Sequence, residues 1–204
     1  MRDLKEYYEN FDINQLKGDV GEVLIAKEFR QLGLTVIRNV YVPIDDFFTE
    51  IDMVVVDKFG NVFVIEVKNF SGYIDCRDKN IYDTDYWLHI TNTGRFVYFQ
   101  NPYKQNKFHC FALKQYLGSL IVYNINIINL VIFTDKSELS YKLKNKILVE
   151  KDIHNWYDEN VDTVVVKDMS KIINKIRNIS DMSEERKSQH IKEIEERRNL
   201  CKKR

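Results

Sequence analysis

The sequence IDMVVVDKFGNVFVIEVK, at residues 51–68, decides the fold of this chain. Two apolar runs flank the segment DKFGN at residues 57–61, which suits a hairpin with a three-residue loop. Gly60 is expected to take the left-handed conformation in that loop, because it has no Cβ to clash there. Asp57 then faces Asn61, and the loop fixes which residues of the two strands are neighbours.

This register brings charged residues together across the hairpin. It places Asp52 opposite Glu66 and Glu50 opposite Lys68, all on one face of the strand pair. A two-residue loop would instead put Asp52 and Glu66 on opposite faces. The sequence therefore predicts a cluster of acids and a lysine that depends on a single turn.

Both faces of the hairpin are otherwise apolar, which predicts a central strand pair covered on both sides. Burying carboxylates there costs on the order of several kcal/mol each unless a counter-charge is present. A divalent metal ion is the natural counter-charge. The apolar positions are Val54, Val56, Val62 and Val64 on one face, and Met53, Val55, Phe63, Ile65 and Val67 on the other.

Length and charge restrict the domain organisation and the kind of binding partner that the chain can have. The 204 residues suit one α/β domain over residues 1–180, followed by a charged helix and tail over 181–204. Lysine and arginine number 31, and so do aspartate and glutamate. This balance gives no overall basic field for nucleic-acid binding, so any such contact must come from local patches.

The cysteines and histidines are scattered, without the spacing of a zinc site. An odd number of distant cysteines suggests a reducing compartment. The chain begins without a hydrophobic signal core and has no apolar run near the roughly 18 residues that a membrane span needs. We therefore expect a soluble, cytoplasmic protein with no membrane partner. The residues concerned are Cys76, Cys110 and Cys201, and His89, His109, His154 and His190.

Residues 13–32 carry a helical pattern that ends at Gly33. Glu22 lies on or beside the apolar stripe of this helix, where a carboxylate is costly. Gly18 and Gly21 lower helix propensity, which close approach to another backbone or a ligand would justify. Alternatively, Glu22 is an acid near the helix start that the helix dipole favours.

The rest of the chain alternates β-prone and helical segments. The aromatic residues of the 80–99 segment can stack on bases or simply pack in the core. Gln105 can reach a phosphate or a metal-bound water, or form a hydrogen bond at its helix start. Strands are expected at 34–42 (ended by Pro43), 73–76, 80–90 with 95–99 as a hairpin, 121–133, 146–149 and 163–166; a loop at 44–49; and helices at 101–118, 168–178 and 183–200.

Asp52 is followed after thirteen residues by Glu66-Val67-Lys68, the arrangement that metal-dependent phosphodiester hydrolysis needs. The carboxylates can hold Mg²⁺, and the lysine can orient or activate a water. With its surroundings, this pattern resembles the nuclease-related domain family, which is similar to the PD-(D/E)xK restriction-endonuclease-like superfamily. The resemblance spans roughly residues 14–118 and rests on GDVGE at 18–22, EIDMVVV at 50–56, GNVFVIEVKN at 60–69, Gly72, Trp87 and NPYKQ at 101–105.

The resemblance implies a restriction-endonuclease-like fold, with a mixed sheet of four or five strands flanked by helices. It also implies a DNA-cleaving site that uses Mg²⁺ or Mn²⁺. Asp52 and Glu66 would be direct metal ligands, and Glu22 would bind through water or hold a second ion. The site residues are expected to be Glu22, Asp52, Glu66, Lys68 and Gln105.

Other interpretations stay open at this point. Lys68 can form an internal ion pair with Glu66 or Glu50 on an ordinary sheet, although Glu22 and Asp52 would then lack partners. The fold can also serve as a non-catalytic module that binds nucleic acid or protein. The charged helix at 183–200 would be its docking element for a protein partner or a second copy. An RNA-directed nuclease is a further alternative.

Overall fold

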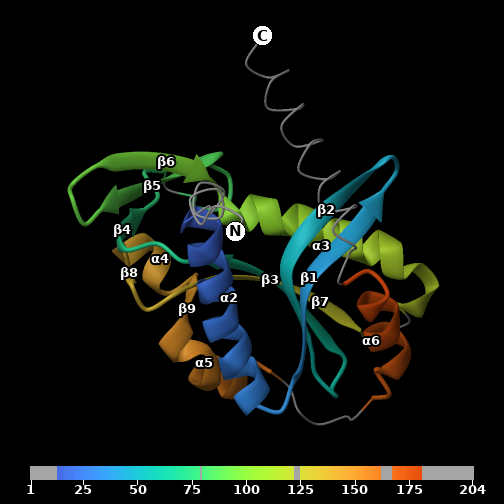
Figure 1. Ribbon diagram of the computed structural model, residues 1–204. Coiled ribbons are helices and arrows are strands. Elements are labelled where there is room, and N and C mark those ends of the chain that lie inside the picture. Colours follow the sequence, from blue (N-terminus) through green and yellow to red (C-terminus); the bar gives the residue numbers. More distant parts are fainter. Residues whose placement is uncertain (1–12, 79, 122–124, 162–166, 181–204) are drawn as a thin grey trace, which may run out of the picture.

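A computed structural model describes residues 13–78, 80–121, 125–161 and 167–180. Its core is a mixed five-stranded sheet with the strand order β1-β2-β3-β7-β9 (Figure 1). Neighbouring strands are antiparallel from β1 to β3 and parallel from β3 to β9. The strands are β1 (Thr35–Ile44), β2 (Phe47–Val56), β3 (Asn61–Lys68), β7 (Asn126–Phe133) and β9 (Leu148–Val149).

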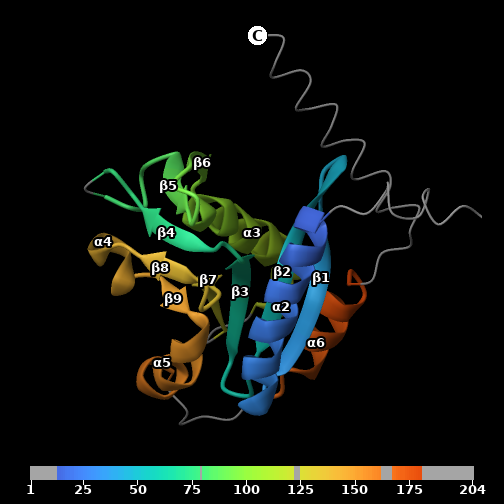
Figure 2. The same ribbon diagram turned by 60° about the vertical axis from the view of Figure 1, so that its left-hand side comes forward.

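Helices cover both faces of this sheet, as expected for a restriction-endonuclease-like α/β fold (Figure 2). Helices α2 (Ile13–Gln31) and α5 (Ile153–Asn160) pack on one face, against Met53, Val55, Phe63 and Ile65. Helices α3 (Pro102–Leu117) and α6 (Ser170–Arg177) pack on the other, against Val54, Val56, Val62 and Val64. The predicted central strand pair, covered on both sides, is confirmed.

A second, four-stranded sheet with the order β6-β5-β4-β8 packs near the carboxyl ends of β3 and β7. Its core includes Trp87 and Phe133, whose rings stack with centroids 6.4 Å apart. The predicted aromatic hairpin is present, but its first strand begins at Tyr86 and residues 80–85 precede it as turns. Some of its rings are packed, and Tyr86, Phe96 and Tyr98 are exposed. The elements here are β4 (Gly72–Asp75), β5 (Tyr86–Thr91), β6 (Phe96–Gln100), β8 (Ser137–Leu139) and α4 (Tyr141–Lys144).

The turn between β2 and β3 has the predicted length and register. Gly60 has a φ of 100°, and the strand pairs run from Val56 with Val62 to Met53 with Ile65. The buried Asp57 carboxylate stabilises this turn with four hydrogen bonds, because it accepts from backbone and side-chain donors that would otherwise be buried unpaired. The donors are Phe59 N (2.8 Å), Asn61 N (2.9 Å), Asn61 Nδ2 (2.7 Å) and Tyr157 Oη (3.2 Å).

Strand β1 bends at Asn39, whose φ is 51°. Ile37 and Val40 lie three residues apart, yet both face the core under α3 and α6. A regular strand alternates its side chains with a period of two, so the alternation shifts once between these residues. Asparagine tolerates the left-handed conformation better than most residues, which suits it to this position.

Strand β2 bends at the matching position, Asp52. Ile51 and Val54 share the same core although they are three residues apart. Beyond the pair of Met53 with Ile65, β2 leaves β3 and continues only beside β1. The pairing between β2 and β3 therefore ends just before Asp52.

Several expectations about element boundaries were wrong. Pro43 does not end the first strand, and residues 44–49 are not a loop, because β1 and β2 form a long hairpin turned at Asp45 and Asp46. Pro43 is tolerated since β1 is an edge strand. The strand at 163–166 and the helix at 183–200 lie outside the described residues. Within the described ranges, no helix is long and apolar enough to cross a membrane.

Candidate active site

Glu66 and Lys68 stand on one face of β3 at its carboxyl end. The Lys68 Nζ atom lies 2.5 Å from Glu66 Oε1, and the Glu66 side chain is only 2% exposed against 19% for Lys68. This is the Glu66–Lys68 ion pair that the sequence left as an alternative. Burial opposes the charge of Lys68, but the carboxylates of Glu66 and Asp52 outweigh it and raise the pKa of Lys68.

Asp52 occupies the bend where β2 leaves β3. Its Oδ2 atom accepts a hydrogen bond from the Val67 backbone N–H at 2.8 Å, in place of a strand pair. Burial, followed by the negative charge of Glu66, raises the pKa of Asp52 to about 8. Burial likewise raises the pKa of Glu66, although Lys68 opposes this. Two carboxyl groups thus share one small space, where ionising both is costly.

Glu22 reaches this space from α2, on the other face of the sheet. Its Oε2 atom lies 2.8 Å from Arg38 Nη2 on β1. Burial and the charge of Asp52 raise the pKa of Glu22 to about 7, although Arg38 lowers it. The expectation that Glu22 and Asp52 would lack partners in the absence of a metal was therefore wrong.

Gly21 explains how α2 comes so close to the end of β3. A Cβ at this position would lie 2.7 Å from the Asn69 Cβ, directly after the strand. Asn69 cannot move away freely, since its Oδ1 accepts a hydrogen bond from Thr134 Oγ1 at 2.9 Å. Among the described residues nothing lies within 4 Å of such a Cβ at Gly18, so the close packing concerns Gly21 and not Gly18.

The two glycines make a matched test of this packing. We expect Gly21→Ala to lower the free energy of unfolding by about 1–3 kcal/mol through overpacking. Gly18→Ala should instead raise it by up to about 1 kcal/mol through helix propensity. Urea unfolding followed by circular dichroism measures both. Equal effects of the two substitutions would contradict the close approach.

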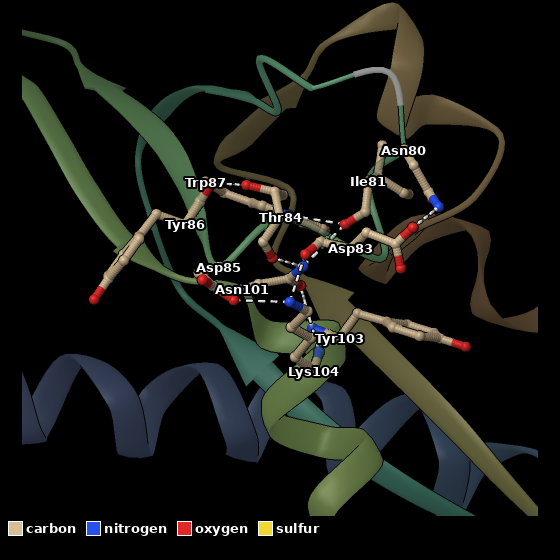
Figure 3. Close-up of polar contacts among 10 residues, drawn as sticks. All are labelled: Asn80, Ile81, Asp83, Thr84, Asp85, Tyr86, Trp87, Asn101, Tyr103 and Lys104. Atoms are coloured by element: carbon tan, nitrogen blue, oxygen red, sulfur yellow. Dashed lines mark hydrogen bonds and ion pairs between the residues drawn. The ribbon is translucent and has the colours of Figure 1, made fainter.

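Helix α3 is fixed beside the site by the Asn101-Pro102 pair (Figure 3). Asn101 Oδ1 accepts from Tyr103 N at 2.9 Å, and its Nδ2 donates to the carbonyl oxygens of Ile81 and Thr84 at 2.9 and 2.8 Å. Lys104 Nζ adds an ion pair with Asp85 at 2.7 Å. The buried side chain therefore joins the helix start to the segment before β5.

His109 on α3 is a residue of the site that sequence reasoning missed. Its Nδ1 lies 3.6 Å from Glu66 Oε2, and both atoms are buried and have no hydrogen-bond partner among the described residues. Burial and the charge of Lys68 lower the pKa of His109 to about 4, so the ring is neutral at pH 7 and the contact is not an ion pair. Gln105, a predicted site residue, is partly buried and precedes His109 by one helical turn. This spacing places both residues on one face of α3, which is the signal in the sequence that could have identified His109.

The donor atoms at this site fit Mg²⁺ or Mn²⁺. Asp52 and Glu66 offer carboxylate oxygens, and Glu66 Oε2 is a buried acceptor that receives no hydrogen bond from the part of the chain that the structure describes. Mg²⁺ is commonly held by one or two carboxylates together with waters and substrate phosphates. Among the described residues, no three His, Cys, Asp or Glu side chains are grouped closely enough to hold a metal. Glu22 faces Arg38 instead, so its role as a ligand stays a prediction.

Glu50 was predicted to lie opposite Lys68, but its neighbour in the structure is Tyr41. The residue is exposed, and its Oε1 accepts a hydrogen bond from Tyr41 Oη at 2.9 Å. The strand pairing that would have placed it opposite Lys68 stops at Met53. The bend at Asp52 is the physical reason.

The mixed sheet with helices on both faces is consistent with a restriction-endonuclease-like fold. The chain matches the model of a family described as nuclease-related domain over residues 17–134, more than half of its 204 residues. It therefore belongs to the nuclease-related domain family. Neither the search of curated proteins nor that of solved structures finds a match.

Proposed function

We propose that this protein hydrolyses DNA phosphodiester bonds with the help of Mg²⁺ or Mn²⁺. The observation that carries the proposal is the meeting of Asp52, Glu66 and Lys68 at the point where β2 leaves β3. Buried carboxyl groups with raised pKa values beside a lysine are more typical of functional sites than of an ordinary sheet. Membership of the nuclease-related domain family supports the same reaction class.

Asp52 and Glu66 would hold the metal ion, and Glu22 would bind it through water or hold a second ion. A bound divalent ion supplies Lewis-acid stabilisation of the phosphate and a water of lowered pKa. Lys68 remains charged at neutral pH beside Glu66. Its ammonium group would orient the attacking water and offset the charge that develops on the phosphate. Gln105 would contact a phosphate or a water from α3.

Cleavage assays test this proposal directly. Supercoiled plasmid and linear duplex DNA are incubated with the full chain in Mg²⁺, Mn²⁺ or EDTA. We expect cleavage with either metal, none in EDTA, and none with Glu66→Gln. Glu138→Gln, a matched change of an exposed glutamate on β8, should cleave normally. Cleavage that persists in EDTA or in Glu66→Gln would refute the assignment.

A second candidate is a binding module without catalysis. The observation in its favour is that Lys68 and Arg38 already pair with Glu66 and Glu22, which offsets charge without a metal. Calorimetry separates the two functions. A nuclease should take up Mn²⁺ and lose that uptake in Glu66→Gln, whereas a binding module should take up none. RNA oligonucleotides in the same cleavage assay show whether the substrate is DNA or RNA.

A further inference from the structure

Arg38 is a charged residue of the site that the sequence motif does not include. It lies on β1 opposite Met53, directly before the left-handed Asn39. Its side chain is 25% exposed, and its Nη2 atom contacts the carboxylate of Glu22. The backbone bend thus places an arginine beside Glu22, near the point where the pairing of β2 with β3 ends.

Among the described residues, the Arg38 guanidinium forms a hydrogen bond to Glu22 and leaves its buried Nε without one. Nη2 meets Glu22 Oε2 at 2.8 Å. Nε is buried and, in the part of the chain that the structure describes, has no hydrogen-bond partner. A guanidinium presents five donors in a planar fork that matches the oxygens of a phosphate. A partly exposed ion pair adds little stability, so the pair with Glu22 gives a weak structural reason for an arginine here.

The local charge balance suggests when this arginine is released. Arg38 pairs with Glu22, and Lys68 pairs with Glu66 next to Asp52, while the charge of Glu50 also acts on Asp52 and Glu66. Arg38 is the positive charge beside Glu22 in the metal-free protein. A divalent ion bound by the site carboxylates would neutralise Glu22 in place of Arg38. The guanidinium would then be free to bind an anion beside the metal.

We propose that Arg38 is a phosphate-binding residue that Glu22 holds in the metal-free site and that passes to a DNA phosphate when the carboxylates bind metal. This inference rests on the proposed nuclease function. Arg38 would contact the substrate backbone and not its bases. Its contribution would therefore be independent of DNA sequence and sensitive to salt.

The first experiment measures affinity without cleavage. A fluorescein-labelled DNA duplex is titrated with the full chain in Ca²⁺, which replaces Mg²⁺, and anisotropy is read at several salt concentrations. We expect Arg38→Met to bind about ten- to a hundredfold more weakly, as for loss of charged hydrogen bonds. Its salt slope should fall by about one. Arg38→Lys should restore the slope but only part of the affinity, and Arg30→Met, an exposed arginine on α2, should change neither.

The second experiment tests a substitution that should strengthen DNA binding. Glu22→Gln removes the carboxylate that holds Arg38, so in EDTA its affinity for the duplex should rise several-fold. The double variant Glu22→Gln/Arg38→Met should lose that gain. If the gain came only from removing one negative charge, it would persist in the double variant, and the proposal would fail.

Metal binding distinguishes failure of this inference from failure of the nuclease function. Calorimetry with Mn²⁺ should show that Arg38→Met binds the ion at least as tightly as the unaltered chain, because a competitor for Glu22 is gone. Weaker Mn²⁺ binding with unchanged DNA affinity would make Arg38 a structural partner of Glu22 alone. An unaltered chain that binds neither Mn²⁺ nor DNA would overturn both proposals.

Discussion

Replacing Asp52 by asparagine is expected to abolish DNA cleavage and to stabilise the metal-free protein above pH 8. Asparagine has nearly the same shape, and its Oδ1 can still accept the Val67 N–H that Asp52 accepts at 2.8 Å. The substitution removes a carboxylate whose pKa burial and Glu66 raise to about 8. Removing a proposed metal ligand should lower the rate by about a thousandfold or more.

The plasmid cleavage assay and thermal unfolding in EDTA at pH 9 measure these two effects. Asp45→Asn is the matched control, since Asp45 is exposed on the same hairpin and its φ of 47° also suits asparagine. It should change neither quantity. An Asp52→Asn protein that cleaves at the normal rate would remove Asp52 from the mechanism. Lower stability at pH 9 would show that its charge is compensated in the fold.

The metal-free protein is expected to lose stability as pH rises from about 6.5 to 8. The pKa values of Glu22 and Asp52 are raised to about 7 and 8. The folded state therefore holds protons that the unfolded chain has released, and the free energy of unfolding falls as the pH passes these values. One such proton over roughly 1.5 pH units corresponds to about 2 kcal/mol.

This prediction applies above pH 6.5, the ordinary pKa of a histidine, because His109 has the opposite effect below it. Its pKa is lowered to about 4 from 6.5, so its contribution to stability rises with pH across that interval and opposes the carboxyl groups. Above pH 6.5 that opposition ends. Urea unfolding in EDTA at pH 6.5, 7.25 and 8 measures the slope. Mg²⁺ should reduce the slope, because metal binding displaces the same protons; a flat profile in EDTA would contradict the raised pKa values.

Local rules were sufficient to predict the central hairpin and its register. Gly60 can take a φ that other residues avoid, and the loop length then fixes the pairs from Val56 with Val62 onward. The covered faces followed from apolar residues at successive positions. The loop brings Asp52 near Glu66 as expected, but the strand pairing ends one residue earlier, at Met53 with Ile65, and Asp52 accepts a hydrogen bond from Val67 N instead.

The bend at Asn39 and Asp52 could not be predicted in the same way. The bend keeps residues on both sides of it, Ile37 with Val40 and Ile51 with Val54, in one core under α3 and α6, and that packing depends on residues far along the sequence. Arg38 was missed for this reason, since in a regular strand it is simply a polar residue at an edge. His109 was missed because its meaning depends on the contact between α3 and Glu66.

The hydrogen bond from Tyr157 to Asp57 has a consequence for how far the folding unit extends. Tyr157 belongs to α5, beyond the last residue of the family match at 134. It helps to hold the turn that aligns Asp52 with Glu66. Helix α6 adds Ile172 and Ile176 to the core beneath the same strands. A shortened protein that ended at residue 134 would keep every motif residue of the family and would still lack part of the framework that brings them together.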